Sequence, residues 1–159
     1  MPHAYWELFF HFTWHTKDNR PLITPRVEPL LHKYLIHRTL KETPGSTVHA
    51  VGGIEDHVYM AVSLPPTALL AKWIGDIKGA SSHHINHGPC GLGSLEWQVG
   101  YGVVSFGKGD LPWVVEYIRN QREHHGRGTV VERLERITVR EDEGGAPEGG
   151  IPKKPAEAG

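Results

Sequence analysis

The sequence of 159 residues lacks several features that would assign it to a specialised class of protein. It contains one cysteine, Cys90, which excludes an internal disulfide framework and a thiolate zinc site. No hydrophobic run approaches the roughly eighteen residues of a membrane span, and the amino terminus has no secretory pattern, so we expect a cytoplasmic protein. The formal net charge is only −1, which argues against a strongly basic nucleic-acid-binding protein.

The chain does have an ordinary globular composition, with an uneven distribution of charge. Hydrophobic residues make up 38% and charged residues 22%, which fits one compact domain, predicted over residues 1–140. Residues 141–159 carry five acidic side chains against two lysines, among glycines and prolines, and we expect this tail to be disordered. The rest is therefore slightly basic, which is compatible with a local phosphate-binding patch.

Hydrophobic periodicity predicts a definite order of strands and helices. Strands are expected at residues 5–16, 47–51, 55–64 and 97–103, with Gly52-Gly53 between the second and third. Helices are expected at residues 25–43, after Pro65-Pro66 and after Asp110, with a short amphipathic segment at 130–137. The order predicts an α+β fold of the ferredoxin-like kind, a split βαβ sandwich whose antiparallel sheet has helices on one face.

Two short motifs carry the candidate chemistry. In the third expected strand, His57 and Tyr59 share one face, because side chains alternate along a strand. In the helix after Asp110, Tyr117 and Gln121 are four residues apart and also share one face. Taken singly, His57 is typical of a half-buried strand histidine and Tyr117 of a packing residue. If the two faces meet, they form a metal-assisted nucleophilic site.

Five short motifs occur in an order that resembles the single-tyrosine HUH transposases and, within that family, the REP-associated tyrosine transposases. The motifs are His11-Phe12-Thr13-Trp14-His15-Thr16-Lys17, Gly52-Gly53-Ile54-Glu55-Asp56-His57-Val58-Tyr59, Pro65-Pro66, Lys78-Gly79-Ala80-Ser81-Ser82, and Tyr117-Ile118-Arg119-Asn120-Gln121 followed by His124-His125. The resemblance covers roughly residues 4–126. It implies a ferredoxin-like fold and a homodimer that acts on single-stranded DNA, often next to a hairpin.

The resemblance also implies roles for individual residues. Tyr117 would attack a phosphodiester and leave a 5′-phosphotyrosine and a free 3′-hydroxyl, while His57, the Tyr59 position and Gln121 would hold Mg²⁺ or Mn²⁺. A phenol with a pKa of about 10 is a weak nucleophile at neutral pH, so it needs accurate placement and a nearby cation. The covalent intermediate conserves the bond energy, so no nucleotide cofactor is expected.

Tyr59 departs from the family pattern, because it stands where the second metal-binding histidine is expected. A neutral phenol is a much poorer ligand for divalent metals than imidazole. Asp56, Glu55 or His11 could replace it as a ligand, the site could bind metal weakly, or catalysis could be lost while DNA binding survives. A strand transferase and a domesticated transposase that binds hairpin DNA without cleavage are therefore both open.

Residues expected to contact DNA lie on two predicted helices. Lys78, Ser81 and Ser82 offer a cation and hydroxyl groups suited to phosphate oxygens, and Arg119 and Arg122 flank the candidate nucleophile. Each of them alone is also typical of a solvated helix face. An RNA-binding sheet is a weaker alternative, because the strands lack the aromatic signature of that class.

Overall fold

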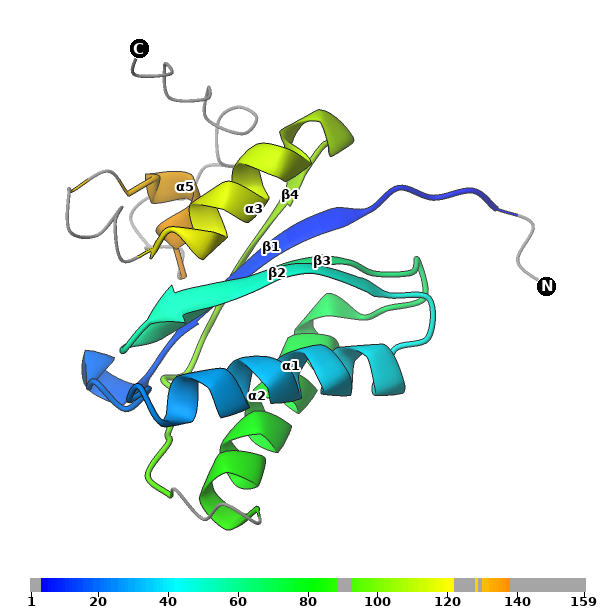
Figure 1. Ribbon diagram of the computed structural model, residues 1–159. Helices are drawn as coiled ribbons and strands as arrows, with labels where there is room; N and C mark the ends of the chain where they lie inside the picture. Colours follow the sequence, from blue (N-terminus) through cyan, green and yellow to red (C-terminus); the bar gives the residue numbers. More distant parts are fainter. Residues whose placement is uncertain (1–3, 89–92, 122–127, 129, 138–159) are drawn as a thin grey trace.

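The computed structural model describes residues 4–88, 93–121, 128 and 130–137, around a four-stranded antiparallel sheet (Figure 1). The strand order is β2-β3-β1-β4. The strands are β1 (Phe9–His15), β2 (Thr47–Ile54), β3 (His57–Ser63) and β4 (Gly102–Phe106). This order is that of the predicted split βαβ arrangement, and the predicted α+β class is confirmed.

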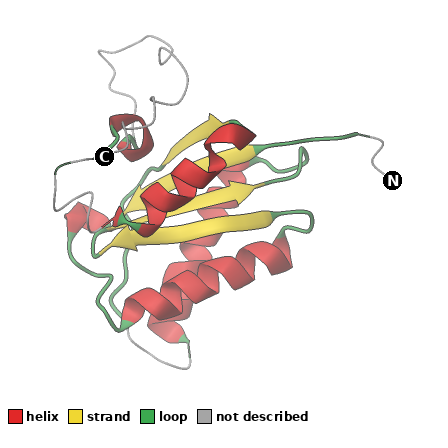
Figure 2. Ribbon diagram, turned by 45° about the horizontal axis from the view of Figure 1, so that its top comes forward, coloured by secondary structure: helices red, strands yellow, loops and turns green. Residues whose placement is uncertain are grey.

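Helices cover both faces of the sheet (Figure 2). On one face, α1 (Val27–Glu42) and α2 (Leu70–His87) pack on Phe12, Met60 and their neighbours, as predicted. On the other face, α3 (Leu111–Arg119) and the short α5 (Glu132–Glu135) form a second core with Tyr59. The predicted sandwich has helices on one face only, so the cover of the second face is a correction; a helix stripe indicates burial without naming its partner. His57 is consequently only 3% exposed.

Two glycines allow the second layer of helices to lie close to the sheet. A Cβ at Gly52 in β2 would lie 2.3 Å from the carbonyl oxygen of Ile118 in α3. A Cβ at Gly102 in β4 would lie 1.8 Å from the carbonyl oxygen of Arg136, next to α5. Both strands therefore present bare backbone where a helical segment crosses them, and any larger residue would push that segment away.

The predicted hairpin is confirmed, but its turn lies elsewhere. Gly52 and Gly53 belong to β2, and the turn is formed by Glu55 and Asp56. Gly53 has a φ of 136°, a conformation that glycine adopts without strain. The glycine pair thus serves the close packing of β2 rather than the turn.

The fourth strand begins later than periodicity predicts. Trp97 makes only an isolated bridge with Thr16, and Val99 is 88% exposed. The Nζ group of Lys78 donates to the carbonyl oxygens of Gln98 and Gly100 at 2.8 and 2.7 Å. These bonds satisfy the backbone of this segment without strand pairing, so apolar alternation alone is misleading here.

Two smaller predictions concern the helices and the tail. The backbone N–H of Val27 donates to Thr24 Oγ1 at 3.3 Å, as expected for a residue that caps α1. The segment predicted at residues 130–137 contains α5. The tail from 141 to 159 lies outside the described residues. Within the part of the chain that is described, no helix is long and apolar enough to cross a membrane.

Candidate active site

A carboxylate links the two tyrosines of the candidate site. The Tyr117 hydroxyl on α3 donates to Glu135 Oε1 at 2.6 Å, and the Tyr59 hydroxyl on β3 donates to Glu135 Oε2. The backbone N–H of Val131 donates to the Tyr117 oxygen at 2.8 Å. The two phenol rings are nearly perpendicular, with centroids 6.3 Å apart. The faces of β3 and α3 therefore meet, and Glu135 bridges them.

Both phenols are held in their neutral form. Burial raises the pKa of Tyr117, and the hydrogen bond to Glu135 raises it further. Burial also raises the pKa of Tyr59, with the negative charge of Glu135 as the next cause. At neutral pH the Tyr117 oxygen is therefore protonated and has to lose its proton before or during any attack on phosphorus.

His57 lies beside Tyr59 on the same face of β3. The ring centroids of His57 and Tyr59 are 4.7 Å apart. His57 Nδ1 is 2.6 Å from Asp56 Oδ1, which favours a proton on Nδ1 and the lone pair on Nε2. Histidines that bind metal commonly have this kind of acceptor behind them, so His57 suits a metal ligand.

Gln121 follows Tyr117 by four residues and lies just beyond the end of α3 at Arg119, so the predicted helix is shorter than its spacing suggested. Its side chain is 1% exposed, and its Nε2 donates to the Tyr117 carbonyl oxygen at 2.6 Å. Its Oε1 is buried with no hydrogen-bond partner among the described residues. An unsatisfied buried carbonyl oxygen is suited to a cation. His57 and Gln121 thus fit a divalent metal, whereas the Tyr59 hydroxyl donates to Glu135 and, as a neutral phenol, is a poor metal ligand.

The three alternative ligands have other positions. His11 Nε2 donates to the Leu134 carbonyl oxygen at 3.0 Å and anchors α5, and burial lowers the pKa of His11 to about 4. Asp56 contacts His57, and Glu55 is exposed in the β2-β3 turn. His11 thus makes a structural contact with α5, and Asp56 contacts Nδ1 of His57.

The family model described as Transposase IS200 like matches residues 4–121. The chain belongs to the IS200-like transposase family. This confirms the resemblance that the motifs carry, and the matched region contains His57, Tyr59, Tyr117 and Gln121. A comparison with curated proteins finds no match.

Two solved structures share the fold of this IS200-like transposase. A proposed transposase from Deinococcus radiodurans has a TM-score of 0.60 and 21% identity, over 76% of this chain and 95% of that one. A REP-associated tyrosine transposase, solved bound to a REP hairpin, has a TM-score of 0.57 and 18% identity, over 79% of this chain and 75% of that one. At these identities the likeness establishes the fold alone.

The residues predicted to contact DNA are divided between the two faces of this family member. Lys78 is held by two carbonyl oxygens, and burial lowers its pKa. Ser81 is buried and donates to the Lys78 carbonyl oxygen at 2.9 Å, whereas Ser82 is more exposed and donates to that of Gly79 at 3.2 Å. All three lie on α2, on the opposite face of the sheet from Tyr117, and their contact with DNA stays a prediction.

Arg119 lies closer to the site. It is exposed at the end of α3 and lines a hollow of about 350 Å³, together with Gly52, Gly53 and Asn120. Arg122 lies outside the described residues. Among the residues that are predicted to contact DNA and that the structure describes, Arg119 is therefore the one on the same helix as Tyr117.

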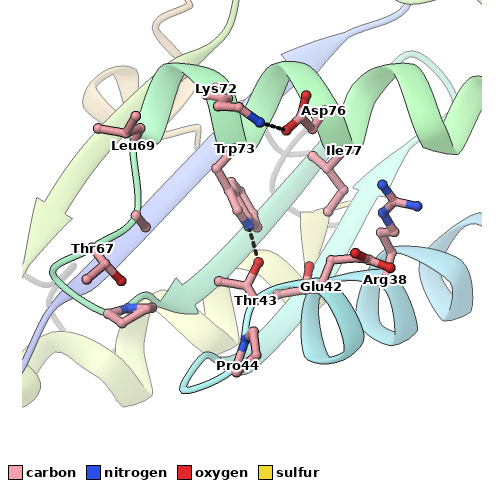
Figure 3. Close-up of a pocket in the computed structure, with 13 residues that line it drawn as sticks. Arg38, Glu42, Thr43, Pro44, Thr67, Leu69, Lys72, Trp73, Asp76 and Ile77 are labelled. Atoms are coloured by element: carbon pink, nitrogen blue, oxygen red, sulfur yellow. Dashed lines mark hydrogen bonds and ion pairs between the residues drawn. The ribbon is translucent and has the colours of Figure 1, made fainter. Parts of the chain in front are cut away.

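A larger hollow of about 440 Å³ lies between α1 and α2 (Figure 3). Trp73 Nε1 donates to Thr43 Oγ1 at 3.1 Å at its base, and Lys72 pairs with Asp76 at 2.8 Å on its rim. The hollow lies on the face away from Tyr117, and its basic side chains are accompanied by acidic ones. It is therefore separate from the candidate site.

Sequence reasoning missed two residues of the site, Glu135 and His15. Glu135 lies within the amphipathic segment predicted at residues 130–137, but that pattern does not indicate that its carboxylate contacts the two tyrosines. His15 shares its strand face with His11, but its position opposite His57 becomes visible only with the register of β1 and β3.

Proposed function

We propose that this chain is a DNA strand transferase that acts on single-stranded DNA beside a hairpin, with Tyr117 as its nucleophile. The observation that carries this function is that Tyr117 lies against Tyr59 on the strand that bears His57, with the Gln121 side chain bonded to the Tyr117 carbonyl oxygen. Membership of the IS200-like transposase family supports it, and one structural relative was solved with a REP hairpin. The predicted homodimer and the absence of a nucleotide cofactor remain predictions of the same proposal.

The proposed reaction transfers a phosphoryl linkage from DNA to the tyrosine. The Tyr117 O–H bond breaks, its proton passes to Glu135 Oε1, and the phenol oxygen bonds to phosphorus. The bond from phosphorus to the 3′ oxygen breaks, and that oxygen takes up one proton from solvent to give a 3′-hydroxyl, while Glu135 returns its proton to solvent, so that no proton is gained or lost overall. Mg²⁺ or Mn²⁺ held by His57 and Gln121 would offset the charge that builds on the phosphate oxygens.

A covalent-adduct assay tests this function. Wild-type protein incubated with a labelled single-stranded oligonucleotide that contains a hairpin, and with Mn²⁺, should give a protein-DNA adduct that resists denaturation. Tyr117→Phe should give none, because it lacks the attacking oxygen. Tyr34→Phe is a matched control, since Tyr34 lies on α1 and stacks on His84 with centroids 4.1 Å apart. An adduct that persists in Tyr117→Phe would rule out Tyr117 as the nucleophile.

A second function, hairpin binding without cleavage, is favoured by one observation. The hydroxyl of Tyr59 donates to Glu135, where an imidazole would offer a lone pair. In this case wild-type protein binds the hairpin and forms no adduct, and Tyr59→His restores an adduct. No affinity for hairpin DNA at modest ionic strength would exclude both functions.

A further inference from the structure

A second histidine lies directly beside His57. In the antiparallel pairing of β1 and β3, His15 is opposite His57. Their rings are stacked, with centroids 5.2 Å apart and an interplanar angle of 30°. Two imidazoles that bind one ion through nitrogen at about 2.1 Å in neighbouring coordination positions have centroids about 5 Å apart. The pair therefore has the spacing of two ligands to a shared cation.

The two imidazoles also have matching second contacts. His15 Nδ1 donates to Asn19 Oδ1 at 2.8 Å, because an amide oxygen only accepts. His57 Nδ1 faces Asp56 Oδ1 at 2.6 Å. In both neutral rings the lone pair is then on Nε2. His15 Nε2 is buried and has no hydrogen-bond partner in the described part of the chain. An oxygen acceptor behind Nδ1 is the usual arrangement of metal-binding histidines.

The third donor, Gln121, lies just beyond the end of α3. Ile118 crosses β2 at Gly52, which pairs with Tyr59 of β3. Beyond Ile118, Arg119 and Asn120 line one hollow with Gly53, so the chain runs toward the His57 end of the hairpin. At the rise of a helix the step from Tyr117 to Gln121 is about 6 Å, and the strand from Tyr59 back to His57 spans about 7 Å. Gln121 therefore reaches the level of His57, and its Oε1 is a second buried acceptor with no hydrogen-bond partner among the described residues.

We propose that His15, His57 and Gln121 hold the divalent cation, with His15 supplying the imidazole that Tyr59 does not. Among the described residues no group of three or more His, Cys, Asp or Glu side chains is placed to hold a metal, and this set instead combines two imidazoles with an amide oxygen. Tyr59 is then a positioning residue for Glu135. The catalytic use of this site rests on the proposed function, whereas metal binding by it does not.

Mn²⁺ titration of the full-length protein tests this site, with the loss of the EPR signal of aqueous Mn²⁺ as the readout. Wild-type protein should bind one ion per chain. Asn19→Ala should weaken Mn²⁺ binding by about 10-fold, because the loss of a group that hydrogen-bonds to a metal ligand costs about 10-fold to 100-fold in affinity. His15→Ala and Gln121→Ala, which remove ligands themselves, should each weaken binding by at least that much. Tyr59→Phe should stay within about 2-fold of wild type, since a phenol adds little as a ligand. His37→Ala, an exposed histidine of α1, is the matched control.

Three results would overturn the site. These are no Mn²⁺ binding by wild-type protein, unchanged affinity in His15→Ala, or a loss in Tyr59→Phe as large as that in His15→Ala. Because His15→Ala can also weaken folding, Asn19→Ala gives a second reading without changing either ring. Mn²⁺ binding that depends on His15, in a protein that forms no DNA adduct, would support the site and exclude strand transfer.

Discussion

Replacing Gly102 by alanine should undock α5 from the sheet. The new Cβ would lie 1.8 Å from the Arg136 carbonyl oxygen and 3.1 Å from Thr13 Cγ2. The carbonyl oxygen would have to move by about 1.5 Å to reach an ordinary C···O separation of ~3.3 Å. Backbone strain does not contribute, because Gly102 is not among the residues with a positive φ.

The size of the effect follows from the contacts that α5 makes. A shift of the segment weakens the hydrogen bond from His11 to the Leu134 carbonyl oxygen and the two bonds to Glu135. It also exposes part of Leu134, which is fully buried. Burial of a leucine contributes about 1.5–3 kcal/mol, and each hydrogen bond about 0.5–1.5 kcal/mol. Since relaxation retains some of these contacts, we expect the free energy of unfolding to fall by about 2–4 kcal/mol.

Urea denaturation followed by tryptophan fluorescence measures this loss. Gly75→Ala is the matched control, because a Cβ at Gly75 in α2 meets nothing within 4 Å. In a helix interior this control should raise stability by about 1 kcal/mol. A Gly102→Ala variant within about 0.5 kcal/mol of wild type would refute the close approach of β4 and the segment after α5.

Three further predictions concern single side chains. His11 has a folded pKa of about 4 against about 6.5 when unfolded. Between these pH values the unfolded chain therefore binds more protons than the folded chain. The contribution of His11 to the free energy of unfolding is complete above pH ~6.5 and falls by up to roughly 3 kcal/mol toward pH 4. His11→Gln should flatten this pH dependence in urea titrations and His37→Gln should not; equal slopes would contradict it. Glu135→Gln removes a charge that raises the pKa of Tyr117 and Tyr59, so tyrosinate absorbance should appear at lower pH, with exposed Glu132→Gln as the unchanged control. Lys78→Met should lower the free energy of unfolding by about 1.5–3 kcal/mol, against less than about 1 kcal/mol for Lys72→Met in an exposed ion pair; equal losses would show that the two carbonyl contacts of Lys78 contribute little.

The sheet could be predicted because its strands keep a period-two pattern. In β1 the alternation separates Phe12 and Trp14, which face α1 and α2, from His11 and Thr13, which face α3 and α5. The extent of β4 could not be predicted, since Lys78 satisfies the carbonyl groups of the preceding segment from another element. Such a contact between distant parts of the chain leaves no periodic signal.

The residues of the candidate site also fall into those that local pattern predicts and those that depend on tertiary contacts. Helical spacing places Tyr117 and Gln121 on one face and strand alternation places His57 and Tyr59 on another, and the family resemblance implies the roles of all four. His15 and Glu135 depend on strand register and on the docking of a four-residue helix. The sequence shows the glycines that let α3 and α5 lie close to the sheet, but it does not show why glycine is needed there. The reason is the close approach of backbone atoms from the segments that cross these glycines. Local pattern thus predicts the residues within each element, and tertiary contacts decide which of them work together.

The second layer of helices stabilises the sheet but restricts access to Tyr117, the proposed nucleophile. Tyr117 is 1% exposed, and the side chain that receives its hydrogen bond is an acid, which repels a phosphodiester. DNA can reach the Tyr117 oxygen only when the groups that cover it move. The contact with Glu135 is made by a helix of four residues, too short to be stable alone, and held by Leu134, His11 and the two tyrosines. Partial opening of this short helix, at a low free-energy cost, would expose the proposed nucleophile while Glu135 stays near enough to accept its proton, which reconciles a buried tyrosine with the proposed attack on DNA.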